Sequence, residues 1–416
     1  MSSAPYPRLL RTPGAAAFFL TATVGRVGIA MTGLGIVWLV HGRTGSYASA
    51  GLVSGGFAVA EALVGPQLAR LIDHFGQTRV LPPLLLAHAA AVTALLALVA
   101  AGSPPELMAI GGVLAGATIP QLGALSAARW VALLREKRPA ELPSAFSLES
   151  LGNAVGYLAG PTLVSVLGAN GHPALGTVLA AALVVTGGGS LAAQHRTAPT
   201  SLTSTSGSDS DSGSGSAERS RAGRSLLRPG FAAVIGLNLA IGVYFGAVQV
   251  SVTAFAVEHH APAAAAPIFA VSNCGGLLAG WLYGVRRWRA TPRLQLAVAT
   301  TGLALGSLLL LTAHSPLALG SVIVLTGAAI PPVLVLLSVL AESTVHRAVL
   351  TQAFTWLNSA GAAGSAGAAA VSGRAVDTFG AAGGFAIAAA GSTGMAVLAV
   401  SLWGRGGGAG GVTDSG

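Results

Sequence analysis

Three charged residues, Arg26, Glu61 and Glu149, lie inside long apolar segments of this 416-residue chain. A charge near the centre of a bilayer costs about 2.5–3.5 kcal/mol on insertion scales, so it is usually paired and functional. Arg26 lies about eleven residues into its segment, roughly 16 Å deep at 1.5 Å per residue. Glu61 lies at a similar depth in the next segment, which runs the opposite way. We therefore expect Arg26 and Glu61 to form a pair.

This predicted pair has two interpretations. It is either a static salt bridge that fixes two helices, or a coupling site. In the second case Glu61 takes up a proton or a cationic substrate and thereby releases Arg26. Transport by Glu61→Gln that keeps its full dependence on a pH gradient would exclude Glu61 as the proton site.

Glu149 lies nearer the end of its segment, and Asn153 follows one helical turn deeper on the same face. These two residues are further candidates for proton or substrate coupling. The alternative is that Glu149 only extends towards basic residues in the preceding loop, namely Arg129, Arg135 or Arg138.

Composition places these charges in a membrane protein. The chain is 53% hydrophobic and 8% charged, whereas a soluble domain is about 25% charged. The net charge of +9 could suggest nucleic acid, but the basic residues form no continuous patch with interleaved aromatics. A single cysteine, Cys274, excludes an intrachain disulfide. The sequence carries no metal-spaced histidine cluster, nucleophile motif or phosphate-binding loop, so we expect neither an enzyme nor a bound metal or cofactor.

A spanning helix needs roughly 20 apolar residues, and the sequence predicts an all-α membrane protein with twelve such segments: 15–40, 47–72, 80–101, 106–134, 144–168, 174–195, 230–257, 264–285, 293–313, 315–341, 350–372 and 380–403. Of the 22 Lys and Arg residues, Arg26 lies deep in a segment, and Arg43 and Arg374 lie in turns after odd-numbered segments. The others lie at the N-terminus, at the C-terminus, or in turns after even-numbered segments and the segment ends that border them. Positive residues mark the cytoplasmic side. We therefore expect both termini in the cytoplasm of a bacterial cell, with the chain in its inner membrane.

The segments divide six plus six. We predict an N-terminal bundle (1–195), a flexible Ser/Gly-rich cytoplasmic linker (196–229), a C-terminal bundle (230–404) and a disordered tail (405–416). The linker is a spacer or, alternatively, a phosphorylated regulatory segment. Short similar sequences occur at corresponding positions of the two halves, such as Ile119-Pro120 in the fourth segment and Ile330-Pro331 in the tenth. They indicate a duplicated bundle.

Twelve segments in two sixes, and a basic turn after the second, resemble the major facilitator superfamily. The family's loop signature is Gly-x-x-x-Asp-(Arg/Lys)-x-Gly-x-(Arg/Lys)-(Arg/Lys), and Asp73, Gly76 and Arg79 match it. Ala69 replaces its first glycine, while His74 and Thr78 replace two basic residues. In the family this aspartate caps a neighbouring helix and locks the outward-open state. The resemblance therefore assigns cytoplasmic gating to Asp73, Gly76 and Arg79.

A second family signature, in the fifth segment, marks antiporters as Gly-x-x-x-Gly-Pro-x-x-Gly-Gly. In this chain Gly152, Gly156 and Gly160 follow one another at every fourth position, and Pro161 comes directly after Gly160. The Gly-Pro end of the signature is therefore kept, but its final glycine pair is absent. Small residues at every fourth position also permit close helix packing in any membrane protein. The resemblance implies export by antiport.

Gln121 and Asn238 fall on helices that line the family's central cavity, and Asn358 is a polar residue of the eleventh segment. We expect these three to contact substrate, although a lone amide also serves as a bond between helices. The sequence thus predicts a monomeric, proton-driven exporter of small amphipathic molecules such as drugs or secondary metabolites. The alternatives are an importer of a small polar nutrient by proton symport, and a membrane protein without transport activity. Its partners are a small-molecule substrate and the lipid bilayer, without nucleic acid.

Overall fold

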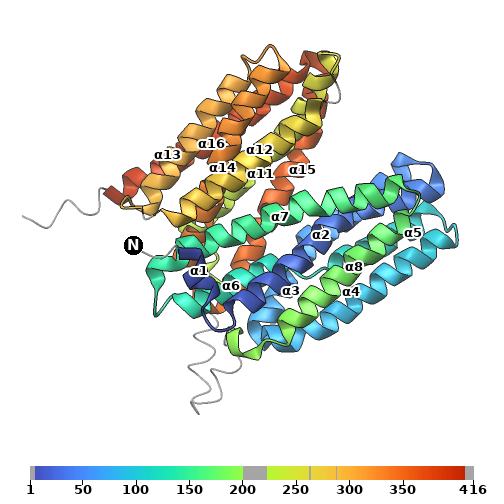
Figure 1. The fold of residues 1–416 in the computed structure, drawn as a ribbon, viewed down its shortest axis with the longest axis horizontal. Helices are drawn as coiled ribbons and strands as arrows, with labels where there is room; N and C mark the ends of the chain where they lie inside the picture. Colours follow the sequence, from blue (N-terminus) through green and yellow to red (C-terminus); the bar gives the residue numbers. More distant parts are fainter. Residues whose placement is uncertain (1–4, 200–222, 262–263, 287, 408–416) are drawn as a thin grey trace, which may run out of the picture. The chain divides into compact units, whose positions relative to one another are not determined.

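In a computed structural model the chain folds into α-helices joined by short turns (Figure 1). The structure describes residues 5–199, 223–261, 264–286 and 288–407. Within these ranges there is no β-strand, and eleven helices are long and apolar enough to cross a membrane. The protein is therefore an all-α, multi-pass membrane protein, as the sequence predicts.

Each predicted segment coincides with a helix or a pair of helices. The first half of the chain contains α1 (Pro5–Leu10), α2 (Ala15–Thr44), α3 (Tyr47–Phe75), α4 (Gln77–Ala100), α5 (Pro105–Thr118), α6 (Leu122–Leu134), η1 (Pro139–Glu141), α7 (Leu142–Ala169), α8 (Pro173–Ala192) and η2 (His195–Thr197). The second half contains α11 (Pro229–Glu258), α12 (Ala265–Val285), α13 (Pro292–Leu310), α14 (Pro316–Thr344), η4 (Arg347–Val349), α15 (Leu350–Phe379) and α16 (Ala381–Gly407).

The eleventh predicted segment forms α15, but this helix is not among the eleven apolar spans. Its 30 residues include Gln352, Asn358, Arg374 and Asp377 together with many glycines and serines. Length and helical structure agree with the prediction, whereas polarity sets α15 apart from the other long helices. Polar residues in a spanning helix commonly mark a functional face.

The fourth predicted segment is broken into α5 and α6 at Ile119–Gln121. A residue before proline is disfavoured in the helical region, and Ile119 is extended, with φ −69° and ψ 125°. Pro120 has no amide hydrogen to continue the helix, and Gln121 is also non-helical, with φ −83° and ψ 67°. The corresponding Ile330-Pro331 pair behaves differently, because α14 remains one helix through it.

The chain forms two compact units. Unit 1 comprises the described residues up to Ala145, Leu151–Leu226 and Val345–Ser359. Unit 2 comprises Phe146–Ser150, Leu227–Thr344 and the described residues from Ala360 onward. The start of α15 thus belongs to unit 1, and its remainder belongs to unit 2.

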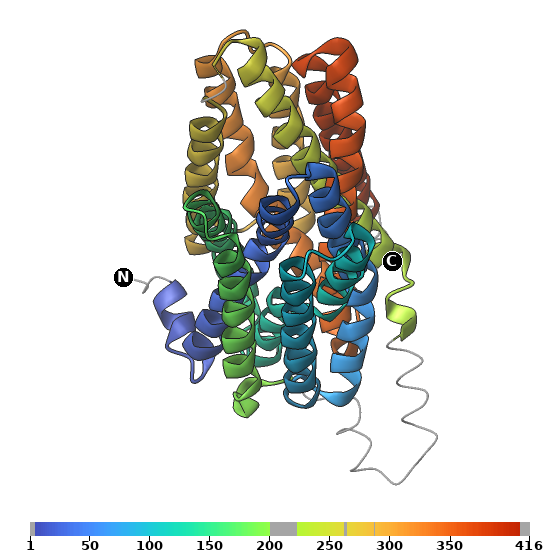
Figure 2. The same cartoon turned by 90° about the vertical axis from the view of Figure 1, so that its right-hand side faces the viewer.

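The two units repeat one pattern of helix neighbours. In unit 1, α2 packs against α8, α3 against α5, and α4 against both α5 and α8. In unit 2, α11 packs against α16, α12 against α14, and α13 against both α14 and α16. Figures 1 and 2 both show α2 and α8 side by side. The shared order of neighbours supports the duplication predicted from the similar sequences of the two halves.

Apolar side chains of α2, α3, α4 and α5 form one cluster of the unit 1 core. Buried residues there include Leu39, Phe57, Leu95 and Met108, and Ile119 at the helix break completes the cluster. A smaller cluster joins α2, α7 and α8 through Met31, Val164 and Ala180. The break therefore lies against a packed core.

The predicted linker and tail lie largely outside the described residues, namely 200–222 and 408–416. Of the described ends of the linker, 196–199 and 223–226 belong to unit 1 and 227–229 to unit 2. Thr197 is buried in unit 1, and the Ser225 hydroxyl accepts a 3.0 Å hydrogen bond from the backbone amide of His346.

Candidate functional site

Glu61 and Gln121 form the centre of a polar cluster in unit 1. The Gln121 amide donates a hydrogen bond of 3.0 Å to Oε1 of Glu61. Glu61 lies in mid-helix on α3, whereas Gln121 ends the break between α5 and α6. Glu61 is half-buried. A carboxylate withdrawn from water needs a hydrogen-bond donor, and this amide supplies one.

Asn358 extends the cluster from α15. Its amide lies 3.5 Å from Oε1 of Gln121. Nearby, a Cβ at Gly65 of α3 would lie 3.4 Å from Thr355 and 3.8 Å from the Gln121 side chain. Thr355 of α15 and Gln121 at the break therefore both lie close to α3 at this point. We refer to Glu61, Gln121 and Asn358 as the α3 polar cluster.

Arg26 is buried on α2, as its depth in the sequence predicted, but the expected Arg26–Glu61 ion pair is not formed. In the described part of the chain, the carboxylate of Glu61 has Gln121 as its polar partner and no basic group within 4.0 Å. Arg26 instead faces the glycines of two other helices. Similar depth on consecutive helices determines only the height of the two side chains along the helices, not which faces of the helices meet.

The glycines predicted to pack on α7 lie against α2. A Cβ at Gly152 would lie 2.8 Å from Nη1 of Arg26, and one at Gly156 would lie 3.4 Å from the Arg26 carbonyl oxygen. At Gly160 the nearest atom is the Ala30 Cβ, at 2.9 Å. Pro161 follows within α7, which continues through it. Gly152 therefore leaves room for the Arg26 side chain, and Gly160 allows α7 to approach Ala30 of α2.

Asn153 lies beside the same arginine. A Cβ built at Gly123 of α6 would lie 3.5 Å from Nε of Arg26 and 3.8 Å from Oδ1 of Asn153. Gly123 is two residues beyond Gln121, so Arg26 and Asn153 lie next to the break that holds the α3 polar cluster. The structure thus gathers five candidates from the sequence, Arg26, Glu61, Asn153, Gln121 and Asn358, around α5, α6 and their junction.

Glu149 and Asn238 belong to unit 2. Glu149 is buried on α7, and Ser147 nearby donates a 2.6 Å hydrogen bond to the Gly280 carbonyl of α12. Asn238 is also buried, and its amide nitrogen would lie 3.3 Å from a Cβ at Gly361 of α15.

Two of the basic residues proposed as alternative partners for Glu149 are occupied elsewhere. Arg138 pairs with Glu141 at 3.2 Å. Arg129, which the sequence analysis placed in a loop, lies within α6 and is fully buried.

The turn after α3 carries the residues assigned to gating. Oδ2 of Asp73 accepts a 2.9 Å hydrogen bond from the backbone amide of Gln352, and Thr351 also lies against this carboxylate. Both belong to the first turn of α15, where unpaired amides and the helix dipole favour a negative charge. Gly76 joins α3 to α4 with φ 95°, a backbone conformation that favours glycine. Arg79 is exposed.

The contacts of Arg129 were not predicted from the sequence. Its guanidinium donates to the side chains of Gln77 (2.8 Å) and Thr197 (2.8 Å). It also donates to the backbone carbonyls of Leu191 (2.9 Å) and Gln194 (2.9 Å), at the end of α8. A cation is favourable at a helix C-terminus. The signal available in the sequence was that Arg129 is a charged residue inside an apolar segment, five residues before the end of that segment.

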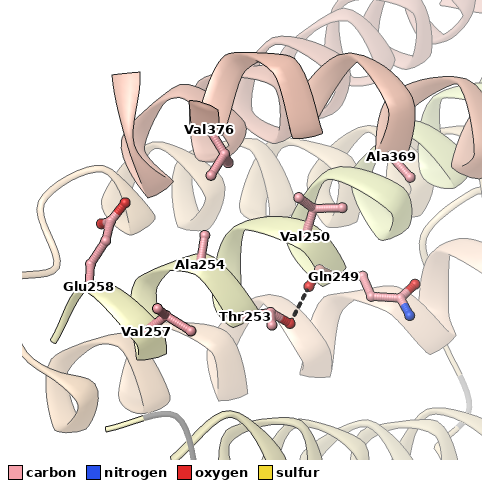
Figure 3. A pocket seen from close by; sticks show the side chains of 8 residues that line it. All are labelled: Gln249, Val250, Thr253, Ala254, Val257, Glu258, Ala369 and Val376. Atoms are coloured by element: carbon pink, nitrogen blue, oxygen red, sulfur yellow. Dashed lines mark hydrogen bonds between the residues drawn. The ribbon is translucent and has the colours of Figure 1, made fainter. Parts of the chain in front are cut away.

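A cavity of about 690 Å³ lies in unit 2 between α11 and α15 (Figure 3). Apolar side chains form most of its wall: Val250, Ala254, Val257, Ala369 and Val376. Three polar residues, Gln249, Thr253 and Glu258, follow one another along α11. The Thr253 hydroxyl bonds the Gln249 carbonyl at 3.0 Å, and Oε1 of Glu258 accepts the Ala381 amide at 2.7 Å, which caps α16.

A duplicated bundle of membrane helices with a carboxylate beside a helix break defines a class of protein, the secondary transporters. A family model of the Major Facilitator Superfamily matches residues 18–369. The chain belongs to this family and is a secondary transporter rather than an enzyme.

Solved structures of the same fold have little sequence in common with this chain. The human organic anion transporter MFSD10 (TETRAN) is 15% identical, with a TM-score of 0.68, covering 92% of this chain and 98% of its own. A bacterial homologue of the iron transporter ferroportin, in its outward-facing state, is 13% identical, with a TM-score of 0.72 and coverages of 93% and 98%. The proton:xylose symporter XylE is 14% identical, with a TM-score of 0.68 and coverages of 94% and 96%. No curated protein matches the sequence.

Proposed function

We propose that the protein is a proton-coupled exporter of small amphipathic molecules that works by alternating access. The observation that carries the proposal is the Glu61–Gln121 hydrogen bond at the break between α5 and α6. Glu61 is an ionisable group within a spanning helix and has a neutral partner rather than a permanent counter-ion. Uptake of a proton therefore changes the net charge of the α3 polar cluster, which is what a coupling site requires.

The same hydrogen bond gives proton uptake a structural consequence. An ionised Glu61 only accepts hydrogen bonds, whereas a protonated one also donates. The Gln121 amide donates to Glu61 with its nitrogen, and its oxygen faces Asn358. Protonation of Glu61 thus favours rearrangement of Gln121 and, through it, of Asn358 on α15. Arg26 and Asn153 lie beside Gly123, two residues beyond Gln121.

The cavity between α11 and α15 supports an amphipathic substrate. Its wall is apolar over most of its residues, and its polar groups lie in a row on α11. Binding pockets for small molecules commonly have about 300–1,000 Å³ and combine apolar walls with a few polar groups, and this cavity fits that range. Asn238, which was predicted to contact substrate, lies on the same helix, three helical turns before Gln249.

We assign cytoplasmic gating to Asp73. Its carboxylate caps the start of α15 through Gln352, the same helix that carries Asn358. Release of this cap and rearrangement of the α3 polar cluster therefore act on one helix. We place both termini in the cytoplasm of a bacterial cell, in its inner membrane, as the distribution of Lys and Arg indicates.

Export is favoured by the Gly160-Pro161 end of the antiporter signature. Import of a small polar solute by proton symport is the second candidate, because a proton:xylose symporter has the same fold. Both directions use the same coupling residue, so direction and coupling are tested separately.

The direct test is flux in proteoliposomes loaded with a panel of amphipathic dyes and, separately, with labelled sugars. We expect dye loss that accelerates when an inward proton gradient is imposed. Glu61→Gln removes the titrating group while keeping the shape of the side chain, and should abolish the acceleration. Glu106→Gln, an exposed acid in the first turn of α5, is the matched control and should behave as the wild type. Gradient-driven dye loss from Glu61→Gln vesicles at the wild-type rate would contradict the assignment.

A further inference from the structure

A second cavity, of about 320 Å³, lies in unit 1 at the N-terminal arm. The arm consists of α1 and the turn that leads into α2. Tyr6 and Leu9 of α1 are buried, so the arm is packed against the protein. The cavity is lined by Pro7, Arg8, Arg11, Thr12, Pro13 and Arg138.

The charge of this cavity is unbalanced. Three guanidinium groups line it, and one carboxylate, Glu141, lies against them. Glu141 contacts Arg8 at 3.4 Å and Arg138 at 3.2 Å. Among the described residues Arg11 is in no ion pair. The cavity therefore carries an excess of two positive charges.

The existing contacts orient Arg8 and Arg138 without neutralising the cavity. Arg138 donates a 2.7 Å hydrogen bond to the hydroxyl of Thr12, which lies one residue beyond Arg11. This bond fixes the turn of the arm above the loop between α6 and α7. Each guanidinium presents several N–H donors in a planar fork, a geometry that matches phosphate oxygens. The cavity thus combines excess positive charge with two oriented guanidinium groups, those of Arg8 and Arg138, and a third, that of exposed Arg11, which is in no ion pair among the described residues.

The position of the cavity indicates which kind of phosphate-bearing molecule can reach it. Pro13 lies two residues before the start of the spanning helix α2, and Arg138 lies directly before the helical stretch Pro139–Gly168, a second span. The ends of spanning helices lie at the level of the lipid headgroups. Basic pockets at this level bind anionic headgroups, and each Lys or Arg near such a surface contributes about 1 kcal/mol.

We propose that the cavity formed by the N-terminal arm and Arg138 binds the phosphate of an anionic phospholipid headgroup. The bound lipid bridges Arg11 of the arm and Arg138 of the loop before α7. The site is separate from the α3 polar cluster and does not depend on the direction or substrate of transport.

The test is native mass spectrometry of the full chain in neutral detergent, titrated with phosphatidylglycerol, phosphatidylcholine or inorganic phosphate. We expect wild-type protein to retain phosphatidylglycerol in preference to phosphatidylcholine. Arg11→Gln should weaken phosphatidylglycerol binding about fivefold. Lys137→Gln is the matched control, because it removes one positive charge from an exposed neighbour of Arg138 outside the cavity, and it should bind as the wild type does.

Two further comparisons make the result decisive. Glu141→Gln removes the competing carboxylate and should tighten binding, a change opposite to that of Arg11→Gln. Inorganic phosphate should not displace the lipid at equal phosphate concentration. If free phosphate does displace it, and this displacement also depends on Arg11, the cavity is a site for free phosphate and the proposal that it binds a lipid headgroup is wrong. Equal weakening by Arg11→Gln and Lys137→Gln would overturn the site, because it would show only general attraction to surface charge.

Discussion

The carboxylate of Asp73, at the end of α3, accepts a 2.9 Å hydrogen bond from the backbone amide of Gln352, at the start of α15. The two residues are 279 positions apart in the chain. Amides in the first helical turn have no partner within the helix, so a carboxylate from elsewhere in the chain both satisfies one of them and interacts favourably with the helix dipole.

This contact predicts that Asp73→Ala will loosen the first turn of α15. Loss of a capping side chain costs about 1 kcal/mol, which corresponds to about fivefold faster exchange of the local amides. Hydrogen–deuterium exchange of peptides that cover residues 350–355 measures the effect. Asp73→Asn keeps an oxygen acceptor and should fall between the wild type and Asp73→Ala. Asp377→Ala, an exposed acid near the other end of α15, should leave these peptides unchanged; equal exchange in all four proteins would refute the capping role.

The Glu61–Gln121 bond predicts an energetic coupling between the two side chains. Gln121→Leu leaves the half-buried carboxylate of Glu61 without its donor. An unsatisfied buried group costs about 1–3 kcal/mol, and partial exposure places Glu61 at the lower end, about 1 kcal/mol. The free energy of unfolding in detergent should therefore fall by about that amount. In Glu61→Gln protein the same Gln121→Leu change should cost less, since a neutral side chain is left instead of a charged one. A double-mutant cycle with no coupling between the two positions would show that the bond contributes nothing.

The helices could be predicted from the sequence because length and apolar composition alone determine which segments can cross a bilayer. The contact of Asp73 with another helix followed from the family resemblance, since the loop signature carries that role. The break at Ile119–Gln121 was not predicted. Its Ile-Pro pair occurs again at Ile330-Pro331, where the helix continues, so local sequence does not determine the outcome. At Gln121 the side chain finds partners on α3 and α15, and these come from tertiary packing.

Side-chain partners were the least predictable feature. Arg26 and Glu61 lie at similar depth, but depth along two helices does not determine which faces meet. Arg129 acquires its partners from α4 and from the end of α8, which come together only in the folded unit. The candidate residues around the break could be named from the sequence, whereas their contacts required the structure.

The approach of α7 to α2 predicts opposite effects for two glycine substitutions. A Cβ at Gly152 would lie 2.8 Å from Nη1 of Arg26, whereas one at Gly55 of α3 meets nothing within 4 Å. Gly152→Ala should displace the Arg26 side chain and lower the thermal midpoint. Gly55→Ala should be neutral or stabilising, because alanine is favoured over glycine in a helix by about 0.5–1 kcal/mol. If Gly152→Ala is as stable as Gly55→Ala, the arginine adapts freely and Gly152 has no role in holding it.

The Arg129 cluster predicts that even a conservative substitution will be harmful. The guanidinium donates to four acceptors: two side chains, of Gln77 and Thr197, and two carbonyls at the end of α8. A lysine ammonium has three donors on a single atom and cannot reach acceptors spread around a planar fork. Arg129→Lys should lower the free energy of unfolding by about 3 kcal/mol, because hydrogen bonds from a charged group contribute about 1.5–3 kcal/mol each.

Arg70→Lys is the control for this substitution, since Arg70 is exposed on α3 and surface changes of this kind are usually within about 0.5 kcal/mol. Denaturant titration in detergent, followed by tryptophan fluorescence, compares the two variants. Trp130 is fully buried and next to Arg129 in the chain, so its fluorescence should report the loss of structure around Arg129. An Arg129→Lys protein as stable as Arg70→Lys would show that the end of α8 is held by apolar packing, and that the buried guanidinium is dispensable to unit 1.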